Sequence, residues 1–110
     1  MDRIPKPIQK VIEDYIIKLS EKIVIDKAII FGSYAKGNIH KYSDIDLAIF
    51  SNYFKNMHRV DGIYFLLMNA VDYEIDLEPQ PFTMEEYYQP VGLVKEIIRT
   101  GIEVPLPVLP

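Results

Sequence analysis

The sequence contains no cysteine. A chain without cysteine can form no disulfide framework, no thiolate metal site and no thiol nucleophile. Small domains framed by disulfides and cysteine-dependent enzymes are therefore excluded as classes. The absence also fits a protein that works in a reducing compartment.

Long hydrophobic runs are also absent. Residues 1–5 lack the apolar segment of a signal peptide. The longest apolar run covers residues 63–68, far short of the roughly 18 residues that a membrane-spanning helix needs. We therefore expect a cytoplasmic protein that does not enter a membrane.

The chain has no excess of positive charge. Twelve lysines and arginines stand against sixteen aspartates and glutamates, which gives a formal net charge of -4 at pH 7. A protein that holds nucleic acid needs a cationic surface to displace counterions from phosphates. The lysines are scattered, and no stripe of aromatic and basic residues appears. A template-reading polymerase is disfavoured, no direct binding of nucleic acid is expected, and a protein or small-molecule substrate is favoured.

What remains is the composition of one small globular domain. The 110 residues are 49% hydrophobic and 25% charged, close to ordinary averages. Such a chain buries a core without disulfides, with little stability to spare. We expect a single domain over residues 1–104. The proline-rich tail over residues 105–110 is either extended and disordered or an apolar strap for a partner.

Hydrophobic periodicity predicts the helices. Apolar residues recur at helical spacing over residues 7–22 and again from about residue 57 to 69. The second helix is apolar nearly all round its C-terminal half, so we expect it to be well buried. Thr83 and Glu86 have the spacing of a capping box that opens a short helix. A last helix is predicted over residues 91–100, with Gly101 as its C-cap.

Three segments are predicted to be strands: residues 27–31, residues 44–50 and residues 71–78. In the second, Ile45, Leu47 and Ile49 share one face, and the alternate residues from Asp44 share the other. The third alternates apolar and acidic residues until the prolines at 79 and 81 end it. With a short helical turn after the first strand, the order predicts a mixed α/β (α+β) domain. Its small sheet of three or four strands is flanked by helices.

Gly32 and Ser33 stand where the first strand gives way to the helical turn. Glycine tolerates a positive φ and lets a ligand approach closely, and the N–H groups that open a helix favour anions. Ser33 adds a hydroxyl donor. The same dipeptide is common in ordinary turns in which serine caps a helix, so both interpretations stand.

Asp44 and Asp46 open the second strand and point to the same face. Two carboxylates a few ångströms apart repel each other unless a cation lies between them. Mg²⁺ prefers such oxygen ligands and commonly binds one or two carboxylates together with substrate phosphates. The alternative interpretation is a solvated strand end.

Asp76 is a candidate third carboxylate if the third strand lies beside the second. Asp72, Glu74, Asp76 and Glu78 together also look like the wet face of an edge strand, which charges protect from aggregation. Because all four share one face of the predicted strand, alternation alone does not indicate which of these carboxylates would join the pair.

The spacing of these residues resembles a known family. Gly32-Ser33, ten further residues and then Asp44-Ile45-Asp46 resemble the signature of the DNA polymerase beta nucleotidyltransferase superfamily. The wider strings over residues 31–38 and 42–47 are similar to its minimal nucleotidyltransferase branch. Residues 73–79 resemble the family's third-carboxylate strand, with Asp76 the best match and Asp72 the second. Residues 83–88 and 94–102 resemble its closing segment.

The resemblance implies a nucleotidyltransferase fold and a set of roles. Asp44, Asp46 and Asp76 would be the catalytic carboxylates and would hold Mg²⁺, as two ions. Asp76 would also help to deprotonate the acceptor. ATP would be the substrate, with its phosphates held by Gly32, Ser33, Lys36 and Ser43. Where the family often has arginine, this chain has Lys36, which keeps the charge but loses the bidentate fork. Lys36 is equally well interpreted as a surface residue.

The resemblance also implies a partner. Stand-alone minimal nucleotidyltransferases resemble the antitoxin of a two-protein pair, which transfers AMP from ATP to a tyrosine hydroxyl of a HEPN-type toxin. The chain lacks the extra domain with which larger members hold their acceptor, and this suits an acceptor that a protein partner supplies. Two alternatives stay open. One is an antitoxin that acts by binding alone. The other is an antibiotic-type small-molecule enzyme, for which a homo-oligomer would supply the missing wall of the acceptor pocket.

Overall fold

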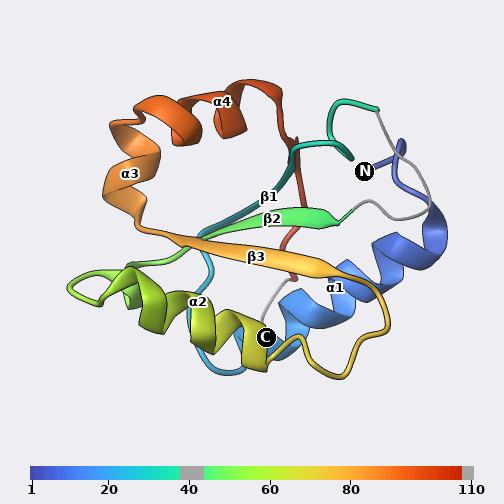
Figure 1. Cartoon of the computed structure of the whole chain (residues 1–110), viewed down its shortest axis with the longest axis horizontal. Coiled ribbons are helices and arrows are strands. Elements are labelled where there is room, and N and C mark those ends of the chain that lie inside the picture. The colour runs from blue at the N-terminus through green and yellow to red at the C-terminus, as the bar shows by residue number, and fades with distance from the viewer. Residues whose placement is uncertain (38–43, 108–110) are drawn as a thin grey trace.

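The computed structural model describes residues 1–37 and 44–107, which build a four-stranded mixed sheet with helices on both faces (Figure 1). The elements are α1 (Lys6–Ser20), β1 (Lys27–Phe31), β2 (Ile45–Phe50), the 3-10 turn η1 (Asn52–Phe54), α2 (Arg59–Met68), β3 (Leu77–Phe82), α3 (Met84–Tyr88), α4 (Gly92–Thr100) and β4 (Ile102–Glu103). The strand order is β3-β2-β1-β4. β1 runs antiparallel to β2 and β4, whereas β2 and β3 are parallel. The predicted mixed sheet flanked by helices is confirmed.

Strand β2 separates two apolar cores, one on each face of the sheet. Ile45, Leu47 and Ile49 pack on the side of α1 and α2, whereas Ala48 and Phe50 pack on the side of α4. The alternation predicted for this strand is confirmed. Figure 1 shows α1 and α2 on one side of the sheet and α3 and α4 on the other. Because alternate residues share a face, Asp46 belongs to the α3–α4 side.

A buried hydrogen bond links helix α1 to helix α2. Tyr15 is fully buried, and its Oη donates a hydrogen bond of 2.7 Å to the carbonyl oxygen of Leu66. Burial raises the pKa of the Tyr15 hydroxyl above its ordinary value, because a phenolate would lose its hydration there. Tyr73 packs edge-on against the same ring at a centroid distance of 6.1 Å.

The third strand does not cover the predicted residues. It runs over Leu77–Phe82, whereas the alternating pattern placed it over residues 71–78. Pro79 and Pro81 lie inside it, although the prediction was that they would end it. A proline lacks a backbone N–H but is tolerated on an edge strand where that position faces away from the neighbouring strand. The carbonyl oxygen of Phe82 accepts a hydrogen bond from Ser51 N, so the backbone polar groups of Phe82 face β2. Pro79 and Pro81 alternate with Phe82 and Gln80, so the backbone positions that lack an N–H face the free edge of the sheet.

Helix α2 is less buried than its composition predicted. Its buried residues are Gly62 and Leu66. On the outer face Val60, Tyr64 and Leu67 are exposed. The expectation of a well-buried helix was wrong, because an all-round apolar pattern does not say which face meets the sheet.

The C-terminal part closes the sheet. The capping box between Thr83 and Glu86 forms, with both reciprocal hydrogen bonds present. Gly101 is the C-cap of α4, and its N–H donates to Ile97 O at 2.8 Å. A side chain at Gly101 would strike Ile29 and the carbonyl of Ile97. Val104 N donates to Ala28 O at 2.8 Å, which extends the pairing of the last strand to the end of the predicted domain.

The start of the predicted tail is partly described. Leu106 is half-buried against the larger core, whereas residues 108–110 lie outside the described part of the chain. Among the helices of residues 1–37 and 44–107, none is long and apolar enough to cross a membrane.

Replacing Tyr15 with phenylalanine tests the link between α1 and α2. We expect Tyr15→Phe to lower the free energy of unfolding by about 1–2 kcal/mol, because the buried hydroxyl bond to Leu66 is lost. Urea denaturation measures this as a lower midpoint with an unchanged slope. Tyr64→Phe is the matched control, since Tyr64 is exposed, and its shift stays within about 0.5 kcal/mol. Equal shifts for the two variants would contradict the role given to Tyr15.

Candidate active site

A tight turn follows β1 and carries the predicted phosphate-binding residues. Gly32 has a φ of 71° and Gly37 a φ of 79°, values that favour glycine. Lys36 N donates to Gly32 O at 3.1 Å. Residues 32–37 form hydrogen-bonded turns, and the bond from Lys36 N to Gly32 O closes a single helical turn, as the sequence predicted. Tyr34 and Ala35, which lie between the exposed residues Ser33 and Lys36, are buried and anchor the middle of the turn.

Gly32 lies directly against the side chain of Asp46. A Cβ at Gly32 would collide with Oδ2 of Asp46. The register of the sheet explains the approach, because Phe31 of β1 is paired with Asp46 of β2. Two features that the sequence placed in separate motifs therefore meet at one point. Glycine is required at position 32 both by the backbone angle and by the carboxylate beside it.

A third carboxylate joins the site from the edge strand, and it belongs to Glu78. In the parallel ladder Asp46 is paired with Glu78. Burial raises the pKa of the Glu78 carboxyl most, and the neighbouring carboxyls of Asp44 and Asp46 raise it further. The structure thus brings Gly32, Asp44, Asp46 and Glu78 together.

Neither Asp76 nor Asp72, the two predicted third carboxylates, is among the groups that shift the pKa of Asp46 or Glu78. Asp76 precedes β3, and its main-chain carbonyl accepts a hydrogen bond of 2.8 Å from Ile45 N. Asp72, the second choice, lies 3.7 Å from Lys18 Nζ of α1. The sequence analysis included Glu78 among four acidic residues of the third strand, and the family resemblance favoured Asp76 and Asp72 over it. The signal that could have found it is the spacing of Pro79 and Pro81, which is typical of an edge strand rather than of a strand end.

The pKa values of Asp46 and Glu78 are both raised above their ordinary values. Burial raises the pKa of Asp46, the charge of Asp44 raises it further, and a hydrogen bond with Glu78 partly opposes the rise. Partial burial also raises the pKa of Glu78, and the charges of Asp44 and Asp46 and its hydrogen bonds with them add to the rise. Since Glu78 and Asp44 are exposed on their outer sides, solvent screens part of this repulsion.

These carboxylates offer the ligands that Mg²⁺ prefers. Within residues 1–37 and 44–107, no group of three or more His, Cys, Asp and Glu side chains has the arrangement of a ready-made metal site. Mg²⁺ does not need a complete protein cage, because it is commonly held by one or two carboxylates together with substrate phosphates and water. The oxygen donors and the mutual repulsion both fit a divalent cation.

The remaining predicted residues flank this cluster. Ser33 is exposed in the turn, and Ser43 lies outside the described residues. Lys36 is exposed as well. The hydrogen bond from Arg99 is the main cause that lowers the pKa of Glu96 on α4, and burial opposes it. The charge of Lys36 lowers this pKa further. The turn therefore runs near α4.

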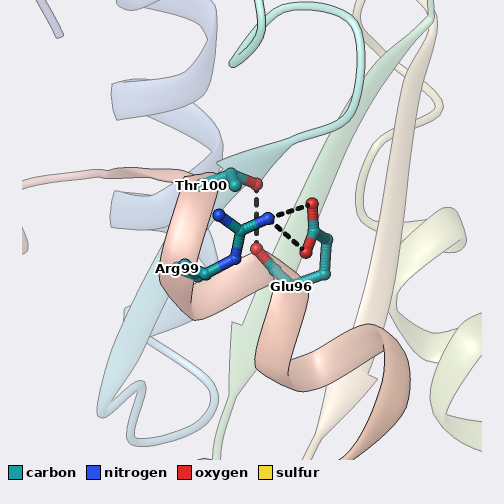
Figure 2. Close-up of polar contacts among 3 residues, drawn as sticks. All are labelled: Glu96, Arg99 and Thr100. Carbon is teal, nitrogen blue, oxygen red and sulfur yellow. Dashed lines mark hydrogen bonds and ion pairs between the residues drawn. The ribbon is translucent and has the colours of Figure 1, made fainter.

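Hydrogen bonds within α4 join Glu96 to Arg99 and Thr100. Figure 2 shows Arg99 reaching back to Glu96, with Arg99 Nη2 at 2.8 Å from Oε2 and 3.0 Å from Oε1. Thr100 Oγ1 donates to the carbonyl oxygen of Glu96 at 2.8 Å. Glu96 is thus paired with Arg99 of its own helix.

The sequence matches a family model described as polymerase beta, nucleotidyltransferase, over residues 13–104. A crystal structure of a candidate nucleotidyltransferase from Sulfolobus solfataricus superposes with a TM-score of 0.67 and 17% identity. The match covers 86% of this chain and 77% of that one. It shows that the sheet and helices have the arrangement of that fold.

A second solved structure is described as a toxin-antitoxin with AMP-PNP. One of its chains matches with a TM-score of 0.52 and 22% identity, over 86% of this chain and 73% of that one. At this identity the likeness concerns the fold. No curated protein sequence matches this chain.

Removing one carboxylate should stabilise the protein when no divalent cation is present. The raised pKa values of Asp46 and Glu78 mean that the folded state loses stability as the pH rises through them. We expect Glu78→Gln to raise Tm above wild type at pH 7–8 in a chelator, with the gain shrinking as the pH falls below the carboxyl range. Differential scanning fluorimetry measures both trends. Glu74→Gln, which removes the same charge outside the cluster, should show neither; an equal gain there would refute the repulsion.

The two glycines of the turn allow a matched comparison. We expect Gly32→Ala to lower the free energy of unfolding by about 2 kcal/mol or more, because strain at positive φ adds to the collision with Asp46. Gly37→Ala should cost only about 1 kcal/mol, since nothing lies within 4 Å of an added Cβ there. Chemical denaturation of the two variants compares them directly, and equal losses would contradict the close approach of Gly32 to Asp46.

Proposed function

The chain belongs to the polymerase beta nucleotidyltransferase family, and we propose that it transfers AMP from ATP to a hydroxyl group of a partner protein. The observation that carries the proposal is the meeting of the Gly32 turn with three carboxylates from two neighbouring strands. A glycine turn suits phosphates, and adjacent carboxylates suit the cation that accompanies a nucleoside triphosphate. Neither feature alone would distinguish this site from an ordinary turn or a solvated strand end.

Each residue of the cluster has a role in this proposal. Asp44 and Asp46 would hold Mg²⁺ beside the triphosphate, and Glu78 would take the third position that the family resemblance gave to Asp76. When bound, Mg²⁺ neutralises the charge that develops on the phosphate oxygens. Gly32 leaves room for the triphosphate beside Asp46, and Ser33 offers its hydroxyl to the β- and γ-phosphates.

The transfer step uses Glu78 as the proton acceptor. The acceptor hydroxyl oxygen forms a bond to the α-phosphorus, and its proton passes to the Glu78 carboxylate. The bond from the α-phosphorus to the bridging oxygen breaks, and pyrophosphate leaves with that electron pair. Glu78 is placed for this role by its pairing with Asp46 in the parallel ladder.

The partner that we propose is a HEPN-type toxin, and the acceptor atom is a tyrosine hydroxyl, so the chain would act as its antitoxin. The choice of this partner and acceptor rests on the family resemblance. The similarity to a structure described as a toxin-antitoxin with AMP-PNP supports it. The site also fits an acceptor brought from outside. The carboxylates lie at the exposed start of β2 and on an edge strand, so a second protein can reach them.

Intact-mass spectrometry tests the transfer. The chain is incubated with a HEPN-type partner, ATP and Mg²⁺, and we expect the partner to gain the mass of one or more AMP groups. Asp46→Asn and Glu78→Gln should each lower the rate by about 100-fold or more, because each removes a group that acts in the transfer step. Asp76→Asn is the matched control and should retain most of the activity.

Three outcomes would change the proposal. Loss of activity in Asp76→Asn with retention in Glu78→Gln would restore the sequence-based assignment. A stable complex with no mass gain on either protein would indicate an antitoxin that works by binding alone. Transfer to a small hydroxylated compound without any partner would indicate an antibiotic-type enzyme.

A further inference from the structure

Residues 69–76 connect the end of α2 to the start of β3, and their alternation decides which way Glu78 points. Tyr73 and Ile75 are partly buried against the core on the α1–α2 side of the sheet, where Leu77 is buried. Because alternate residues of an extended chain share one side, Glu78 turns to the opposite side, where Asp46 lies. The way in which this connection enters β3 therefore determines whether Glu78 reaches the candidate site.

Tyr73 ties this connection to helix α1. Its Oη donates a hydrogen bond to Oδ2 of Asp14, and its ring meets the ring of Tyr15 edge-on at a centroid distance of 6.1 Å. The ammonium of Lys18 lies 5.1 Å from the centroid of the Tyr73 ring and 3.7 Å from the carboxylate of Asp72. One side chain of the connection thus meets three residues of α1 that are close in sequence.

The point on α1 to which Tyr73 is tied is well fixed. The neighbouring Tyr15 is fully buried and bonded to the carbonyl oxygen of Leu66, so α1 cannot slide along α2. A hydroxyl that donates to a carboxylate makes a stronger hydrogen bond than one between neutral groups. Burial raises the pKa of the Tyr73 hydroxyl, and the bond to Asp14 raises it further, so the hydroxyl keeps the proton that it donates.

A short path leads from Tyr73 to the candidate site. Three residues further on, the carbonyl oxygen of Asp76 accepts a hydrogen bond of 2.8 Å from Ile45 N, at the start of β2. Two residues after that, Glu78 is paired with Asp46. Strand β3 lies at the edge of the sheet and has β2 as its neighbour on one side. The start of β3 therefore depends on this bond and on the connection that leads into it.

We propose that Tyr73 is a positioning residue for the transfer step. Its hydrogen bond to Asp14 holds the start of β3 in place, so that the carboxylate of Glu78 stays beside Asp46. Tyr73 itself packs on the other side of the sheet and touches no reacting atom. The use of Glu78 as proton acceptor rests on the proposed function, whereas the anchoring of β3 by Tyr73 does not depend on any reaction.

Amide hydrogen exchange of the full chain, followed by NMR without ligand, tests the anchoring. The Ile45 amide donates to Asp76 at one end of β3, and the Ser51 amide donates to Phe82 at the other. We expect Tyr73→Phe to speed the exchange of the Ile45 amide about tenfold and to leave the Ser51 amide unchanged, because only one end of the strand is released. Tyr15→Phe is the matched control, and its effect on the two amides should be equal.

Steady-state kinetics of AMP transfer to a HEPN-type partner tests the positioning. We expect Tyr73→Phe to lower kcat about tenfold and to leave the KM for ATP unchanged, because Glu78 acts on the proton of the acceptor and not on ATP. Tyr15→Phe also loses one hydroxyl bond, yet it should keep kcat at temperatures well below its Tm. In a Glu78→Gln background, Tyr73→Phe should cause no further loss, since it acts through Glu78.

Several results would overturn the proposal. Equal acceleration of the Ile45 and Ser51 amides in Tyr73→Phe would show a general loss of stability instead of a local release. An unchanged kcat, or a tenfold loss that persists in the Glu78→Gln background, would separate Tyr73 from the action of Glu78. A wild type that transfers no AMP would refute the proposed function and with it the catalytic use of Tyr73, whereas the exchange of the Ile45 amide would still report the anchoring.

Discussion

The position of Asp46 in the sheet is set by two strand pairings at once. Its pairing with Phe31 brings the Gly32 turn against one side of the carboxylate, and its pairing with Glu78 brings a second carboxyl to the other side. A slip of one residue in either register would turn the side chains to the opposite face. The apolar residues of β2 prevent this slip, because Leu47 and Ile49 are fully buried and cannot exchange places with Asp46. The core thereby fixes the geometry of the candidate site.

That geometry has an energetic cost. Burial, and after it the neighbouring carboxyl charges, disfavour the charged forms of Asp46 and Glu78 and raise their pKa values. The apolar cores on both sides of β2 must offset this repulsion whenever no cation is bound. Such a cost is expected at a site that binds a cation together with its substrate, because repulsion in the free protein becomes attraction in the complex.

Features that depend on local sequence could be predicted, and features that depend on pairing could not. The bounds of β1 and the two faces of β2 follow from runs and alternation within a few residues. The capping box at Thr83 is equally local. Glu78 escaped prediction because its place depends on which residue of β3 lies beside Asp46, and the acidic alternation over residues 71–78 offered four equal choices. The outer face of α2 escaped because periodicity finds apolar residues without saying what covers them.

Pro79 and Pro81 also decide how this sheet can meet other chains. Their positions leave the outer edge of β3 without two backbone donors, and Arg59 Nη1 already donates to the carbonyl of Pro81 at 2.8 Å. An extended peptide that tried to join this edge would find no ladder to continue. The opposite edge is the two-residue strand β4, which is too short to act as a template. Recognition by main-chain hydrogen bonding is therefore closed at both edges, and any protein that binds this molecule must read its side chains.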